Sequence, residues 1–118
     1  MIVTLCQYAI IKNDLLANAS TVEELLSGQQ SDLLILPECF SSGFCIEPKT
    51  LNDPLAIKTE KWLKGLSQGQ LVVASYPKKL HSEYYNHLGL FYNGLLADSY
   101  KKVHLFPGEE EEYYTSGT

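Results

Sequence analysis

Residues 33–38 read Leu-Leu-Ile-Leu-Pro-Glu, and this stretch decides the fold class. Its four apolar residues run without a polar interruption, which predicts a strand that is covered on both faces. Pro37 closes the strand, and Glu38 follows it at once. Because ligands bind at the carboxyl ends of the strands in open α/β sheets, Glu38 is the first candidate for a functional residue.

The segments on either side of residues 33–36 predict strands and helices in alternation. Further strands are expected at 2–10, 71–74, 84–92 and 95–106, and helices between Asp14 and Gly28 and at 54–67. Asp14 and Asp53 are the predicted caps of the two helices, and Asn93-Gly94 predicts a tight hairpin between the last two strands. Strand–helix–strand units imply parallel strands with crossover helices, and the hairpin adds antiparallel strands. The fold class is therefore α/β with a mixed sheet.

Length and composition favour one domain over residues 1–118, with 45% apolar residues and a modest core. The net charge is −5 and all nine cations are lysines, which argues against nucleic acid as a partner, because phosphate backbones favour basic surfaces with arginine forks. No apolar run approaches the ~20 residues that a membrane-spanning helix needs. No basic region precedes the first apolar stretch, so we expect a cytoplasmic protein without a signal peptide.

The chain has three cysteines, Cys6, Cys39 and Cys45. An odd count without a secretory signal argues against a disulfide framework, and the spacing of Cys39 and Cys45 does not match a zinc site. We therefore expect three reduced thiols and no metal.

Glu38 and the pair Lys101-Lys102 are the residues most suited to chemistry. A carboxylate at the end of a buried strand is partly desolvated, which raises its pKa and suits a general base; alternatively, Glu38 faces solvent. Strand alternation places Lys101 and Lys102 on opposite faces, so one of them can face a site and stabilise an oxyanion. The alternative is two surface lysines on an edge strand, which are common.

Two motifs together resemble the nitrilase superfamily of carbon–nitrogen hydrolases. Residues 36–44 resemble its L-P-E-x-F-x-x-G-F segment, and residues 100–106 resemble its Y-x-K-x-H-L-F segment. Weaker agreement is found at Gln7, at Asp14 with Asn18, and at Tyr85-Asn86. The resemblance covers nearly the whole chain, and the most similar branch is the omega-amidase-like one.

This resemblance implies the N-terminal half of a four-layer α-β-β-α sandwich and the hydrolysis of small amides without a cofactor. Glu38 would be the general base, Lys102 would hold the tetrahedral intermediate, and a cysteine would form a thioester. Many members carry a second glutamate after the H-L-F segment, and counting back from Gly117 places it on Glu110. Taken alone, the run of four glutamates at 109–112 is typical of a solvated loop.

The chain departs from the family pattern because the family's nucleophile lies in a C-Y-D-x-R-F-like segment beyond residue 118. None of the three cysteines has that context. Three interpretations stay open: the N-terminal portion of a hydrolase, an inactive remnant or interaction protein of the same fold, and an unrelated acidic α/β binding module. We expect Glu38 to lie close to Lys102, with Lys102 more buried than Lys101. We also expect no turnover by the isolated chain, and self-association through apolar strands such as 71–74.

Overall fold

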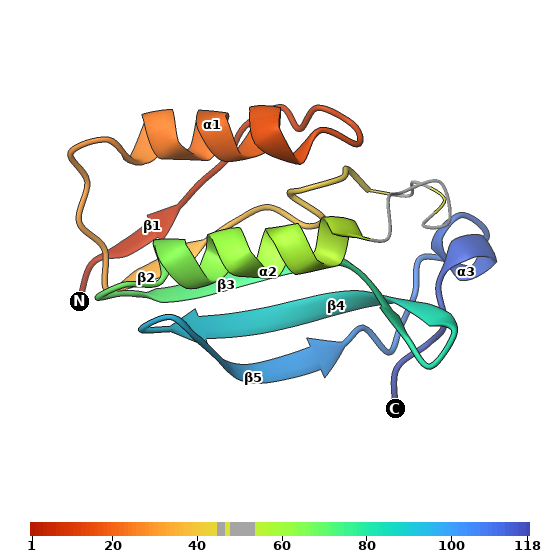
Figure 1. Cartoon of the computed structure of the whole chain (residues 1–118). Helices are drawn as coiled ribbons and strands as arrows, with labels where there is room; N and C mark the ends of the chain where they lie inside the picture. The colour runs from red at the N-terminus through yellow and green to blue at the C-terminus, as the bar shows by residue number, and fades with distance from the viewer. Residues whose placement is uncertain (45–46, 48–53) are drawn as a thin grey trace.

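The computed structural model describes residues 1–44, 47 and 54–118, which form a five-stranded sheet and accompanying helices (Figure 1). The elements are β1 (Val3–Leu5), α1 (Leu15–Leu26), β2 (Leu33–Ile35), α2 (Pro54–Leu66), β3 (Leu71–Leu80), β4 (Glu83–Tyr92), β5 (Leu95–Lys101) and α3 (Glu110–Tyr113). The sheet order is β1-β2-β3-β4-β5, with β1, β2 and β3 parallel and β4 and β5 antiparallel. The predicted mixed sheet is confirmed. No helix in the described ranges is long and apolar enough to cross a membrane.

Helix α1 begins after its predicted cap. The Asp14 carboxylate accepts a hydrogen bond from Ala17 N at 3.0 Å, which satisfies one of the amides that have no partner in the first turn. The buried Asn18 amide bonds both backbone groups of Ile11, each at 2.8 Å, and so ties the chain before α1 to the helix. Past the end of the helix, Gly28 has a φ of +75°, a left-handed conformation that glycine adopts without strain.

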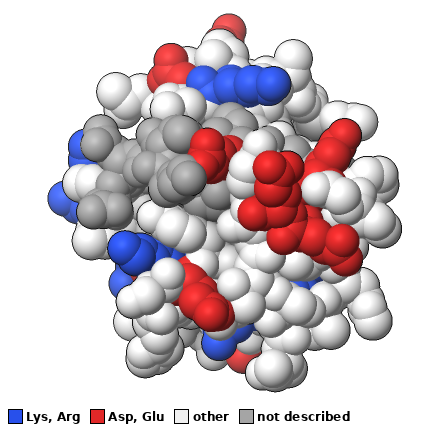
Figure 2. Space-filling model, turned by 90° about the vertical axis from the view of Figure 1, so that its right-hand side faces the viewer, with Lys and Arg blue, Asp and Glu red and all other residues white. Residues whose placement is uncertain are grey.

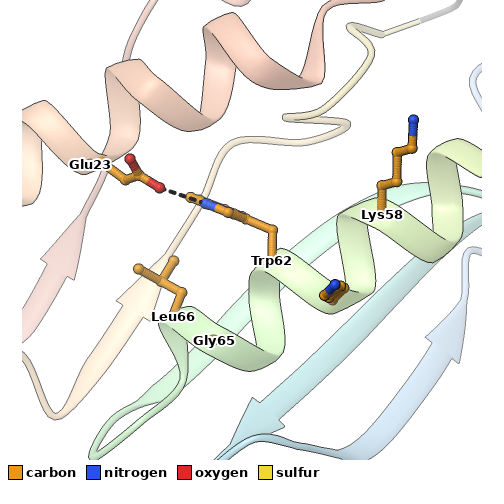
Figure 3. Close-up of a pocket in the computed structure, with 6 residues that line it drawn as sticks. Glu23, Lys58, Trp62, Gly65 and Leu66 are labelled. Carbon is orange, nitrogen blue, oxygen red and sulfur yellow. Dashed lines mark hydrogen bonds between the residues drawn. The ribbon is translucent and has the colours of Figure 1, made fainter.

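Helix α2 packs on β3 through Thr59 and Leu63, which are fully buried. It contacts α1 through Trp62, whose Nε1 donates a hydrogen bond to Glu23 at 2.8 Å (Figure 3). The predicted cap of α2, Asp53, lies outside the described residues.

The two faces of the sheet differ, because α1 and α2 lie on the same side of it (Figure 1). We call the side under the helices the covered face; its buried residues include Leu34, Val72, Ala74, Tyr76 and Phe91. We call the other side the open face; its apolar residues are Val3, Leu5, Leu33, Ile35, Leu71, Val73, Leu88, Leu90, Tyr92, Leu95 and Tyr100. These side chains are half-buried or exposed, so the prediction that residues 33–36 are covered on both faces is wrong for the open face. The described helices α1 and α2 cover only one side.

Strand β1 is shorter than the predicted segment 2–10. Strand pairing extends only over the register Val3–Leu33 to Leu5–Ile35, because β2 itself ends at Ile35. One more hydrogen bond follows, from Cys6 N to Ile35 O at 3.0 Å, and the chain then leaves the sheet toward α1.

The hairpin between β4 and β5 turns at Asn93 and Gly94, as predicted, with positive φ at both residues. Its turn is fixed to the end of α2, since Asn93 N donates to Ser67 O at 2.9 Å and Gly94 N to Ser67 Oγ at 3.0 Å. The hairpin thus continues the sheet while its turn is held by the helix layer.

Candidate active site

Glu38 lies in a turn after β2, and the backbone of the next residue shapes this turn. Cys39 has a φ of +52°, a region that residues other than glycine rarely adopt. Its conformation is fixed from both sides: Cys39 N donates to Ser75 Oγ in β3 at 2.9 Å, and Cys39 O accepts from Gly43 N at 2.8 Å. The turn presents the Glu38 carboxylate to residues that follow β5 and to β4.

Lys102 comes directly after β5, which ends at Lys101 and not at Phe106 as predicted. Lys102 N still bonds Asn86 O in β4 at 2.9 Å, so the lysine keeps its place at the strand end. Its Nζ donates to Glu38 Oε1 and to Glu110 Oε2, each at 2.9 Å. Lys101 points elsewhere, with its Nζ 4.7 Å from the ring centroid of Tyr85. Both lysines are half-buried, so their direction and not their burial separates them.

Glu110 opens the short helix α3 and is fully buried, although its neighbours in the acidic run, Glu109 and Glu111, are exposed. Its Oε2 accepts from Lys102 Nζ and from Phe106 N, each at 2.9 Å. Burial by itself would raise the pKa of Glu110, but the hydrogen bonds from Asn86, Lys102 and Phe106 outweigh it and hold the pKa below its usual range. Glu110 and Glu38 together raise the pKa of Lys102, although its burial opposes this effect.

The structure brings the three predicted residues together and adds a fourth, Asn86. Its Nδ2 donates to Glu38 Oε1 at 2.8 Å and to Glu110 Oε1 at 3.0 Å. The sequence offered only the Tyr85-Asn86 dipeptide as a weak motif match and gave Asn86 no role. We call Glu38, Asn86, Lys102 and Glu110 the polar cluster.

Three members of the polar cluster, Glu38, Asn86 and Lys102, line a hollow of about 290 Å³ on the open face. The hollow is otherwise lined by Ser75 and by the apolar side chains of Ile35, Leu36, Val73, Leu88 and Tyr100. The Glu38 side chain is 47% exposed, because it stands at the rim of this uncovered face. Figure 2 views the end of the molecule that carries α3, and acidic side chains gather there.

The described cysteines are not placed to act as nucleophiles. Cys39 is fully buried, and burial, followed by the charges of Glu38 and Glu110, raises the pKa of its thiol to about 12. Burial also raises the pKa of Cys6. Both are free thiols, and Cys45 lies outside the described residues. Within the described residues, no group of three or more His, Cys, Asp or Glu side chains could hold a metal ion.

Fold and site together define a class of protein: an α/β domain with two carboxylates joined by a lysine at the carboxyl edge of a mixed sheet. The family model for carbon–nitrogen hydrolases matches residues 2–118, and the chain belongs to this family. The predicted family is thereby confirmed, whereas the catalytic roles of Glu38, Lys102 and Glu110 stay predictions. No curated protein sequence matches the chain.

Three solved structures of similar fold are each about twice as long as this chain. An amidase from Nesterenkonia sp. has a TM-score of 0.89 and 23% identity, over 100% of this chain and 48% of that one. A CN-hydrolase superfamily protein from Xanthomonas campestris, solved with an arsenic adduct in its active site, has a TM-score of 0.84 and 29% identity, over 98% of this chain and 46% of that one. A carbon–nitrogen hydrolase from Helicobacter pylori has a TM-score of 0.81 and 23% identity, over 100% and 45%. The chain therefore spans about half the length of these neighbours.

Proposed function

We propose that this chain supplies the general base and the lysine of a thiol-dependent hydrolase that cleaves the carbon–nitrogen bond of small amides, in the manner of the omega-amidase-like branch. The observation that carries the proposal is the contact of Lys102 Nζ with both Glu38 and Glu110 at 2.9 Å beside a hollow. Amide hydrolysis needs a carboxylate that moves a proton and a cation that stabilises an oxyanion, and this cluster offers both side by side.

The proposed steps assign one task to each charged residue. Glu38 takes the proton of the attacking thiol; the thiolate adds to the amide carbon, and the carbon–nitrogen bond breaks as ammonia leaves with that proton. Glu38 then activates the water that hydrolyses the thioester. Lys102 uses two of its three N–H groups on the carboxylates and directs the third at the oxyanion. These steps move only protons and electron pairs among side chains, substrate and water, so no cofactor is required.

The nucleophile of the proposed reaction lies outside residues 1–118. Cys39 adjoins Glu38 in sequence, but its buried thiol strongly disfavours the thiolate that attacks. One solved form of the Nesterenkonia amidase shows acrylamide added at an active-site cysteine, which supports a thiol route in a protein of this fold. We place the reaction in the cytoplasm, where thiols stay reduced.

A second candidate function is an inactive interaction protein of the same fold. It is favoured by the open face, where Leu5 is 71% exposed and Leu95 is 69% exposed. Apolar surface of this kind is typical of a face that binds another protein surface.

The purified 118-residue protein should release no ammonia from monoamides of dicarboxylic acids, because the base and the lysine have no nucleophile to activate. Turnover that disappears in Cys39→Ala would identify this chain's own nucleophile and contradict the assignment. Turnover that survives replacement of all three cysteines would defeat the thiol mechanism.

A second experiment tests whether a completed hydrolase is active. This chain is produced together with the part of the Xanthomonas campestris protein that it does not match. Ammonia release is expected, and Lys102→Met should lower kcat/KM by about 100-fold or more, because it removes the oxyanion donor. Lys101→Met is the matched control and should keep the activity, since Lys101 points toward Tyr85. Equal effects of the two substitutions would contradict the role of Lys102, and no ammonia release at all would argue for the inactive interaction protein.

A further inference from the structure

Asn86 closes a ring of hydrogen bonds around the two carboxylates of the polar cluster. Its Nδ2 bonds Glu38 Oε1 and Glu110 Oε1, while Lys102 Nζ bonds Glu38 Oε1 and Glu110 Oε2. Asn86 is 3% exposed, and its backbone oxygen also accepts from Lys102 N. One side chain and its own backbone thus contact all the other members of the cluster.

The chemistry of the ring decides which protonation state it stabilises. An amide NH₂ and an ammonium group donate hydrogen bonds but do not accept them, so the ring stabilises two ionised carboxylates. Two carboxylates that share their donors would otherwise tend to share a proton, because their charges repel. Lys102 supplies one positive charge against two negative ones, so the remaining stabilisation has to come from neutral donors such as Asn86 Nδ2.

We infer that Asn86 is a positioning residue that keeps Glu38 and Glu110 as two separate acceptors, so that neither holds a proton shared with the other. Its consequence for catalysis rests on the proposed function: Glu110 stays paired with Lys102, and Glu38 keeps an oxygen for the nucleophile's proton. Among the described residues, Glu38 Oε2 has no hydrogen-bond partner, so this oxygen is available to accept the nucleophile's proton. Among the described residues, further titratable groups near the cluster include Cys39 after β2 and Tyr100 in β5.

Carbon-13 NMR titration of the glutamate carboxyls tests the inference in the 118-residue protein and needs no turnover. Asn86→Leu keeps the side-chain size and removes both donors, so the titration midpoint of Glu110 should rise by about one pH unit or more. Asn86→Asp replaces the donors by a third carboxylate and should raise the midpoint further.

Asn18→Leu is the matched control. Asn18 is as buried as Asn86 and has both amide atoms bonded, but its partner is the backbone of Ile11, so its loss should destabilise the fold without moving the Glu110 midpoint. The unsubstituted protein gives an independent measurement, because the side-chain amide signals of Asn86 should change with pH as Glu110 titrates.

Unchanged glutamate midpoints in both Asn86 variants would overturn the inference. If neither variant folds, Asn86 amide signals that do not follow the titration of Glu110 would overturn it as well. If the co-produced enzyme is inactive but the NMR midpoints shift as expected, the proposed function is wrong and the inference on Asn86 stands. The two tests can therefore fail separately.

Discussion

The covered face and the open face of the sheet are built from alternate residues of the same strands, yet they differ in what they do. Along β3, Val72 and Ala74 lie under the helices and are at most 1% exposed, while Val73 points the other way and is half-buried. Along β4, His87 faces the helices and its neighbour Asn86 belongs to the polar cluster. The covered face therefore carries most of the stability, and the open face carries the candidate site.

Burial explains why the two tasks are separated. The covered face contains the core cluster, where tight packing leaves little room for a substrate. The polar cluster needs access for a substrate and for water, so it lies at the rim of the open face. The same face exposes apolar side chains, and we propose that copies of this chain associate through it.

Aspartate at two adjacent positions of β3 should have opposite consequences. Val72→Asp buries a charge without a partner on the covered face and should cost more than about 4 kcal/mol, enough to unfold the chain. Val73→Asp places the charge on the open face, so the fold should persist while self-association weakens. Circular dichroism with urea titration measures the first effect, and light scattering measures the second.

Light scattering compares the unsubstituted protein and Val73→Asp at the same concentration. If both are monomeric, the proposed self-association is wrong. The comparison of faces fails if Val72→Asp and Val73→Asp unfold at the same urea concentration.

His87 makes the covered face sensitive to acid. It is 3% exposed, its Nδ1 has no hydrogen-bond partner among the described residues, and burial, followed by the charge of Lys78, lowers its pKa to about 4. Lys101 lowers the pKa further, Glu60 opposes this, and the Tyr76 ring lies 5.1 Å away. Since the unfolded chain takes up the proton first, the stabilisation is complete above pH 6.5 and is lost as the pH falls toward 4. The loss should reach up to about 3 kcal/mol.

Urea titrations between pH 7 and 4 measure the slope of the free energy of unfolding against pH. His87→Phe should flatten it, while His104→Gln, at an exposed histidine, should leave it unchanged. If His87→Phe shows the slope of the unsubstituted protein, the acid sensitivity comes from other groups.

Local sequence signals predicted the two long helices, α1 and α2, well. The features that the sequence did not predict depend on contacts between residues far apart in the chain. Helix α1 carries its own cap at Asp14, so its start could be read from the sequence. The end of β1 depends instead on the length of its partner β2, which no residue within 2–10 encodes.

The candidate site shows the same division. Glu38 and Lys102 stand in motifs, and the family pattern placed Glu110. Asn86 acquires its role from Glu38 and Glu110, which are 48 and 24 residues away in sequence, so no nearby pattern marks it. The burial of Glu110 within a run of four glutamates follows from Lys102 and Phe106, and the composition of the run argues against it.

Two glycines give the smallest effects, with opposite signs. A methyl group at Gly89, on the covered side of β4, would lie 2.5 Å from the ring of the fully buried Phe91, so Gly89→Ala should cost about 1–3 kcal/mol. Gly65 lies in α2 beside Trp62 (Figure 3), and a methyl group there meets nothing within 4 Å. Gly65→Ala should stabilise the protein by about 0.5–1 kcal/mol, because alanine loses less backbone entropy in a helix. Thermal and urea unfolding of both variants measure the difference. If Gly89→Ala is as stable as Gly65→Ala, the covered face packs more loosely around Phe91 than its burial indicates, and the contrast between the two faces weakens accordingly.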